Sequence, residues 1–183
     1  MNNNFAYLTS QILIIIVYIL ICITYFCKNR KKILIVNIFA HIFQALSFLL
    51  LNGLTGVSMN IVYVIRDSFF MIDEKNRKSK VLNKRDYFIL LILILIITIF
   101  TIFTYNGWPS LLSVAATTIS TIAIWQKNTK YYKLLGIPVS LAWLGYDIYL
   151  KSFFAIILES ILLIVTIIGY LKEVKTKKKD YES

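Results

Sequence analysis

The chain has 183 residues, 58% of them hydrophobic, and its mean hydropathy is +0.73. Soluble domains contain about 45–50% apolar residues, so this excess, gathered in long runs, excludes an ordinary soluble domain and predicts a polytopic membrane protein. The net charge is +11, which in a soluble protein would suggest a nucleic-acid partner. Because the basic residues lie between the apolar runs, membrane topology explains them better, and we expect no nucleic-acid partner.

Seven apolar runs each have about the 20 residues that a helix needs to cross the bilayer. The first is expected to be a membrane helix rather than a signal peptide, because its leading segment MNNNFAYLTS has no Lys or Arg. The two cysteines lie in that run and predict neither a disulfide framework nor a metal site. We therefore expect an all-α chain with one transmembrane domain, 1–183. The runs are 5–27, 33–52, 54–72, 87–105, 108–125, 131–150 and 152–171.

The basic residues favour one orientation in the membrane. With seven spans, eighteen of the 20 Lys and Arg fall on one side, in the loops 28–32, 73–86 and 127–133 and in the tail 172–183. The opposite side has only Lys151. The positive-inside rule then places the N-terminus outside and the basic tail in the cytoplasm, for a multi-pass protein of the inner or plasma membrane.

The chain compared with itself indicates an internal repeat. Under a shift of 99 residues, FCKNRKK falls on WQKNTKY, and the first three spans fall on the last three without a gap. Asn60 falls on Glu159. We therefore expect two parallel three-helix repeats, 5–72 and 108–171, joined by a linker helix at 87–105 (3+1+3). Such repeats enclose a site near the middle of the membrane.

Three stretches carry a family resemblance: FLLLNGLTGVSMNIVYVIRD, LLSVAATTISTIAIW and LAWLGYDIYLKSFFAIILES. They resemble the YgjV-type family of bacterial inner-membrane proteins, and the resemblance runs from about Ile12 to Lys172. That family is similar in layout to the SWEET, PQ-loop and PnuC-type transporters. The resemblance implies architecture better than activity, and this chain lacks the Pro-Gln dipeptide of the PQ-loop proteins.

Polar side chains within the spans provide the candidate site. Asn37, His41 and Gln44 form one stripe of a helix, at i, i+4 and i+7. Ionisable groups deep in a span are expected to face the interior of the bundle, and Trp and Tyr there could stack on a ligand. The predicted substrate-binding residues are Asn60, Glu159, Arg66, Trp143, His41, Gln44, Tyr63 and Asp147.

Arg66 poses a specific question, because it stays charged at ordinary pH. Adjacent residues on a helix point about 100° apart, so Asp67 is not expected to be its partner. Since Cβ atoms tilt toward the helix N-terminus, we predict that Arg66 leans toward the membrane centre and pairs with Glu159. The alternatives are that Arg66 extends to the cytoplasmic interface, and that Glu159 is a neutral carboxyl hydrogen-bonded between helices.

The sequence favours transport of a small polar solute, by facilitated diffusion, through this site. The alternative is a non-transporting accessory or scaffold protein whose buried polar residues serve helix packing. We expect no enzyme, because no Walker-type loop, nucleophile elbow or HExxH motif occurs, and no metal or cofactor. The expected partners are the lipid bilayer and a small polar solute, and the span 87–105 faces lipid or a second copy of the chain.

Overall fold

The computed structural model describes residues 3–26, 30–73, 84–125 and 129–182. All regular structure in these ranges is α-helical, which confirms the all-α class and the seven helices. Of the predicted basic loops 28–32, 73–86 and 127–133, residues 28–29, 74–83 and 127–128 lie outside the described residues, and the rest belong to the neighbouring helices. The helices are α1 (Asn3–Phe26), α2 (Arg30–Leu50), α3 (Leu54–Asp73), α4 (Lys84–Thr104), α5 (Ser110–Trp125), α6 (Thr129–Tyr149) and α7 (Phe153–Glu182).

Three of the described helices have the length and apolar composition of membrane helices. Asn4–Ile23, Asp86–Thr104 and Phe153–Leu171 are each long and apolar enough to cross a membrane, and α2, α5 and α6 contain shorter apolar segments. Large apolar side chains such as Ile102 and Phe103 are exposed on the outer surface. Exposing many large apolar side chains to water is unfavourable, so this surface is consistent with contact with lipid tails. The backbone of α7 continues past the predicted end of its span at 171.

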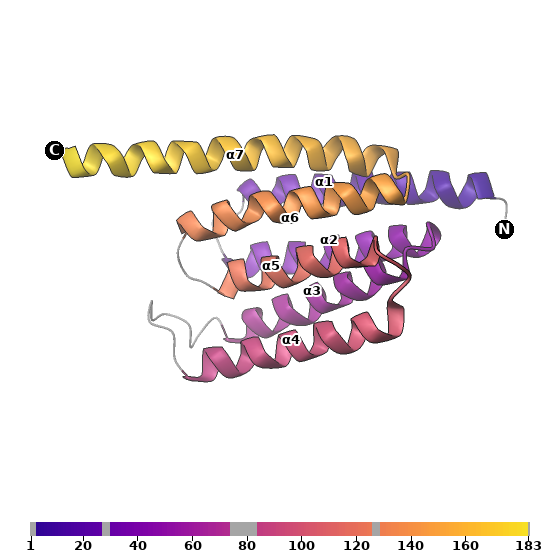
Figure 1. The fold of residues 1–183 in the computed structure, drawn as a ribbon. Helices are drawn as coiled ribbons and strands as arrows, with labels where there is room; N and C mark the ends of the chain where they lie inside the picture. Colours follow the sequence, from indigo (N-terminus) through magenta and orange to yellow (C-terminus); the bar gives the residue numbers. More distant parts are fainter. Residues whose placement is uncertain (1–2, 27–29, 74–83, 126–128, 183) are drawn as a thin grey trace.

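Most packing is between helices that follow one another in the chain, so we refer to α1–α3 as the first group and to α5–α7 as the second, with α4 beside α3 and α5 (Figure 1). In each group the middle helix of the sequence is also the middle one in space: α1 packs on α2 and α2 on α3, while α5 packs on α6 and α6 on α7. The groups meet where α3 contacts α5 and where α1 contacts α7. Helix α4 packs on both α3 and α5. The N-terminus and the turns after α2, α4 and α6 share one end of the molecule, and the C-terminus lies at the other.

The turns α2–α3 and α6–α7 have the same backbone geometry. Asn52 and Lys151 both have left-handed backbone conformations, with φ of 58° and 54°. The next N–H donates back to the helix end, from Gly53 to the Phe48 carbonyl in one turn and from Ser152 to the Asp147 carbonyl in the other. Both are the Schellman arrangement that ends a helix sharply, so each pair of helices is joined by a very short connection.

Candidate functional site

A cavity of about 480 Å³ lies between the two groups of helices. Pockets for small ligands commonly have volumes of roughly 300–1,000 Å³. Every helix except α4 contributes to its walls. Its polar and aromatic lining residues are Tyr18, Asn37, His41, Gln44, Tyr63, Arg66, Ser120, Ser140, Trp143, Glu159 and Thr166.

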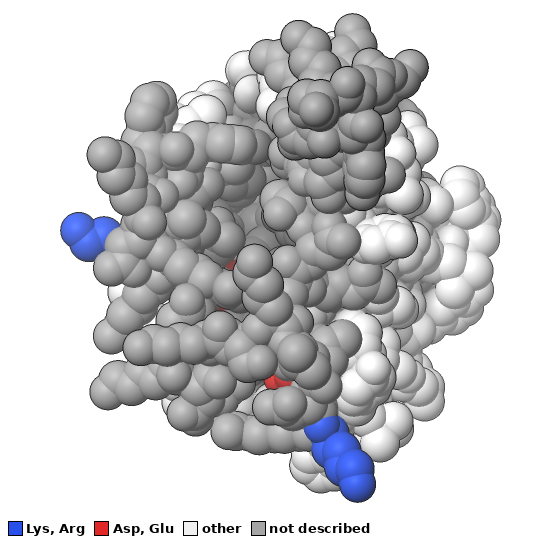
Figure 2. Space-filling model, turned by 90° about the vertical axis from the view of Figure 1, so that its left-hand side faces the viewer, with Lys and Arg blue, Asp and Glu red and all other residues white. Residues whose placement is uncertain are grey.

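The cavity extends toward the end of the molecule that holds the C-terminus. On α7 its lining runs from Glu159 to Gly169, which at 1.5 Å per residue is about 15 Å along the helix. Figure 2 looks onto this end, where a few acidic atoms are visible. The cavity is therefore deep and reaches the middle of the helix bundle.

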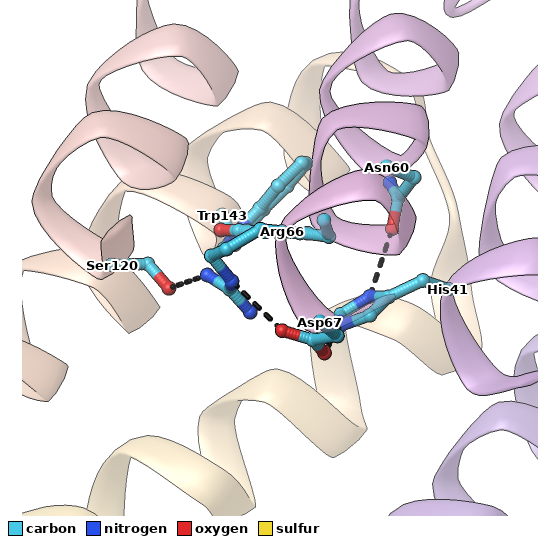
Figure 3. Close-up of polar contacts among 7 residues, drawn as sticks. His41, Asn60, Arg66, Asp67, Ser120 and Trp143 are labelled. Atoms are coloured by element: carbon cyan, nitrogen blue, oxygen red, sulfur yellow. Dashed lines mark hydrogen bonds and ion pairs between the residues drawn. The ribbon is translucent and has the colours of Figure 1, made fainter. Parts of the chain in front are cut away.

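A polar network from α2, α3 and α5 forms one wall (Figure 3). The Arg66 Nε donates to Asp67 Oδ1 at 2.8 Å, and Nη1 donates to the Ser120 hydroxyl at 3.0 Å. The guanidinium carbon also lies 4.5 Å from the centre of the Tyr63 ring, a cation–π contact. Arg66 and Asp67 are 2% and 0% exposed, so this ion pair is shielded from water and its two charges compensate each other locally.

The predicted Arg66–Glu159 ion pair is wrong. Arg66 pairs with the neighbour that the sequence analysis excluded, and among the described residues no ion pair joins it to Glu159. The angle between neighbouring Cβ directions does not decide the contact, because the long arginine side chain bends back and brings its Nε to the carboxylate of Asp67. Arg66 also does not extend to the cytoplasmic interface, since it is buried against α5.

His41 connects this network to Asn60, about two turns earlier on α3. Its Nδ1 lies 3.2 Å from Asn60 Oδ1, and its Nε2 lies 3.7 Å from Asp67 Oδ2. The Asn60 side-chain amide also donates to the Gly56 carbonyl at 2.9 Å. Since Asn60 is 0% exposed, its role in this structure is to hold the His41 ring in place from behind the cavity wall.

Glu159 forms the opposite wall with a different set of partners. The Tyr18 hydroxyl donates to Glu159 Oε2 at 3.0 Å, and the Ser140 hydroxyl also donates to the carboxylate. Asp147 lies close enough to interact electrostatically with both Glu159 and Tyr18. Within the described residues, no basic side chain pairs with Glu159. This carboxyl group is therefore held by hydroxyls rather than by a counter-charge.

An aromatic cluster closes the far end of the cavity. The Phe48 ring stacks on Trp143 with 5.7 Å between centroids, and it meets Tyr146 edge-on at 5.5 Å. The Tyr146 hydroxyl accepts a hydrogen bond from the Gly56 N–H at 2.9 Å. A Cβ on Gly56 would lie 2.7 Å from the Tyr146 ring and 2.8 Å from Phe48, so only glycine allows α3 to approach this closely.

The structure sorts the predicted site residues into two sets. Six of them line the cavity: Glu159, Arg66, Trp143, His41, Gln44 and Tyr63. Asn60 and Asp147 lie behind the lining, with 0% and 1% exposure. Tyr18 and Ser140, which hold Glu159, were not among the predicted site residues. Ser140 corresponds to His41 under the 99-residue shift and could have been found from it, whereas Tyr18 stands alone in an apolar run.

The fold and cavity define a class: an integral membrane protein of seven helices with a polar cavity between two groups of three. The chain belongs to the bacterial inner membrane protein family Imp-YgjV, which it matches over residues 8–177. This confirms the resemblance found in the sequence and the membrane localisation. Searches of curated proteins and of solved structures found no match.

Proposed function

We propose that this protein moves a small polar solute across the membrane through the cavity between the two groups of helices. The observation that carries the proposal is the cavity itself. A protein that only needed stable helix packing would fill this space with side chains, because membrane helices associate through close van der Waals contact. Here charged and polar groups from six helices surround a space of about 480 Å³ instead.

We also propose an internal repeat, which agrees with this function. Residues 99 positions apart have matching geometry: α2 (Arg30–Leu50) corresponds to α6 (Thr129–Tyr149) over its whole length, and α3 and α7 begin at the matching positions Leu54 and Phe153. The two left-handed turn residues, Asn52 and Lys151, are also 99 positions apart. The contact of α3 with α5 corresponds to that of α7 with α1. These correspondences fit the 3+1+3 arrangement, with α4 as the linker.

Many residues that line the cavity also correspond under the 99-residue shift, as expected of a site on the axis between two related bundles. Two hydrogen-bonded pairs also correspond, His41 with Asn60 and Ser140 with Glu159. Both lie between the second and third helices of their group. Pairs of lining residues related by 99 positions are Ile21 and Ser120, Asn37 and Gly136, Ala40 and Val139, His41 and Ser140, Gln44 and Trp143, Tyr63 and Leu162, and Arg66 and Val165.

We further propose that the cavity faces the cytoplasm. The positive-inside rule assigns the basic loops and the C-terminal end of α7 to that side, and the lining extends toward this end as far as Gly169. The cluster of Phe48, Trp143 and Tyr146 then closes the outer side. A carrier in this state would release its solute inward or load it from the cytoplasm, and transport would require the aromatic cluster to part.

The test is solute flux into vesicles that contain the purified protein. We expect uptake of at least one member of a panel of labelled small polar metabolites above that of empty vesicles. Glu159→Gln should lower that uptake on the order of tenfold, with an unfolding temperature close to that of the unchanged protein. Thr98→Val is the control, because Thr98 is on α4 and donates only to the Ile94 carbonyl of its own helix. Uptake equal to that of empty vesicles across the whole panel would contradict the proposal.

A second candidate function, an accessory protein without transport, is favoured by one observation. Several buried polar contacts lie away from the cavity and only join helices, such as Ser47 to the Ser10 carbonyl at 3.0 Å and Thr55 to the Thr104 carbonyl at 2.6 Å. If Glu159 also serves only packing, Glu159→Gln should lower the unfolding temperature and change no flux. Measuring both quantities on the same preparation separates the two functions.

A further inference from the structure

The two charged walls of the cavity are not equivalent. Arg66 is neutralised within its own wall, by the carboxylate of Asp67 at 2.8 Å. The Ser120 hydroxyl accepts another hydrogen bond from the Arg66 guanidinium, and the Tyr63 ring lies against the guanidinium. A solute that brought a negative charge to Arg66 would have to compete with a carboxylate that is already in place and 0% exposed. This wall therefore offers little net attraction for an anion.

The opposite wall carries carboxyl groups that have no basic partner among the described residues. Glu159 lines the cavity and receives hydrogen bonds from the hydroxyls of Tyr18 and Ser140. Hydrogen bonds donated to a carboxylate stabilise its charged form. Asp147 lies nearby, and its Oδ1 is buried with no hydrogen-bond partner in the described structure. Among the described residues no Lys or Arg pairs with either acid, so a positive group that enters the cavity would supply the missing counter-charge and stabilise the ionised carboxylate.

We infer that the cavity binds a solute carrying an ammonium group, which docks on the Glu159 carboxylate between Tyr18 and Ser140. This inference rests on the proposed function, because it names the class of solute that the proposed carrier would move. The volume of about 480 Å³ fits an organic cation rather than a bare metal ion. The polar groups of Gln44 and Asn37, which also line the cavity, can hydrogen-bond the rest of such a solute.

The experiment measures binding to the detergent-purified protein, independently of flux. The probes share a three-carbon chain and differ in charge at pH 7: 3-amino-1-propanol is a cation, 1,3-propanediol is neutral and 3-hydroxypropanoate is an anion. Binding is followed by the rise in unfolding temperature and by tryptophan fluorescence, since Trp143 lines the cavity. Ionic strength is held constant with sodium chloride, so that sodium ions are present in every sample.

We expect the amine to bind on the order of tenfold more tightly than the diol, and the anion to bind no better than the diol. Glu159→Gln should remove the preference for the amine, while Glu159→Asp should keep it in weaker form. Ser113→Ala is the matched control, because Ser113 is buried and donates only to the Ser110 carbonyl of its own helix.

The outcomes distinguish the inference from the transport function. Equal binding of amine and diol, tighter binding of the anion, no binding of any probe, or an amine preference that survives in Glu159→Gln would each overturn the inference. The first three are measured on the unchanged protein, so they do not depend on whether a variant folds. Binding of the amine without flux in vesicles would leave the inference intact and contradict transport. Flux of anions or neutral solutes would support transport and contradict the inference.

Discussion

The two groups of helices place polar side chains at corresponding positions but satisfy them in different ways. In the first group, Arg66, Asp67, His41 and Asn60 bind one another. In the second group, Glu159 depends on hydroxyls from both groups, Ser140 of α6 and Tyr18 of α1. A charge that is compensated internally contributes mainly to the integrity of the fold, whereas one held only by hydroxyls remains available to a ligand. From this comparison we predict that the Arg66–Asp67 pair serves mainly stability and that Glu159 serves solute recognition.

The largest loss in the free energy of unfolding is expected from breaking the Arg66–Asp67 ion pair of the first group. Asp67→Asn leaves the Arg66 guanidinium buried without a counter-charge, and removing one partner of a buried pair costs about 3–5 kcal/mol. We expect a loss of this order in the free energy of unfolding, measured by denaturant titration in detergent micelles. Glu159→Gln in the second group should cost much less, because its hydroxyl partners can also bond to an amide. Equal losses for the two variants would contradict the proposed difference between the groups.

The double variant Arg66→Met, Asp67→Asn tests whether the unpaired charge of Arg66 causes the loss of stability in Asp67→Asn. It removes both charges at once, and replacing a whole buried pair is often close to neutral. We expect the double variant to be more stable than Asp67→Asn alone. A loss equal to the sum of the two single losses would show that Arg66 and Asp67 act independently, and would remove the ion pair as the explanation.

The sequence predicts the overall fold better than the contacts of the site. Seven helices follow from the apolar runs, and six cavity-lining residues follow from polar groups placed deep in the spans. The partner of Arg66 does not follow from helix geometry, because a long flexible side chain can reach its own neighbour. Tyr18 could not be singled out either: in IIIVYILIC it is one aromatic residue in an apolar run, and only the packing of α1 against α7 brings it to Glu159.

A smaller effect is expected at the closed end, where the two groups meet. Gly56→Ala places a methyl group 2.7 Å from the Tyr146 ring of α6 and 2.8 Å from Phe48. Overpacking of this kind costs about 1–3 kcal/mol, and the strain can be relieved by moving α3 and α6 apart. We expect a lower unfolding temperature and faster solute flux, because the aromatic cluster closes the outer side in the proposed mechanism.

Gly169→Ala is the matched control for Gly56→Ala. Both glycines lie in helices, but a Cβ at Gly169 would have no heavy atom within 4 Å. Alanine is favoured over glycine inside a helix by about 0.5–1 kcal/mol, so this variant should be slightly more stable than the unchanged protein. A destabilisation as large as that of Gly56→Ala would show that the close approach at the aromatic cluster is not the cause.

The smallest effect concerns the two equivalent turns. Asn52 and Lys151 have the same left-handed backbone, with φ of 58° and 54°, but asparagine adopts this conformation at a lower cost than lysine. Lys151→Gly should therefore raise the free energy of unfolding by about 0.5–1 kcal/mol, whereas Asn52→Gly should change it little. The Lys151 carbonyl that accepts from Tyr7 is kept in the variant, so the comparison isolates the backbone. Denaturant titration of both variants measures the difference, and an equal gain at the two turns would contradict it. Because the turns are otherwise alike in their hydrogen bonds, the difference would show that corresponding positions of the two groups share a backbone geometry while differing in how well their residues suit it.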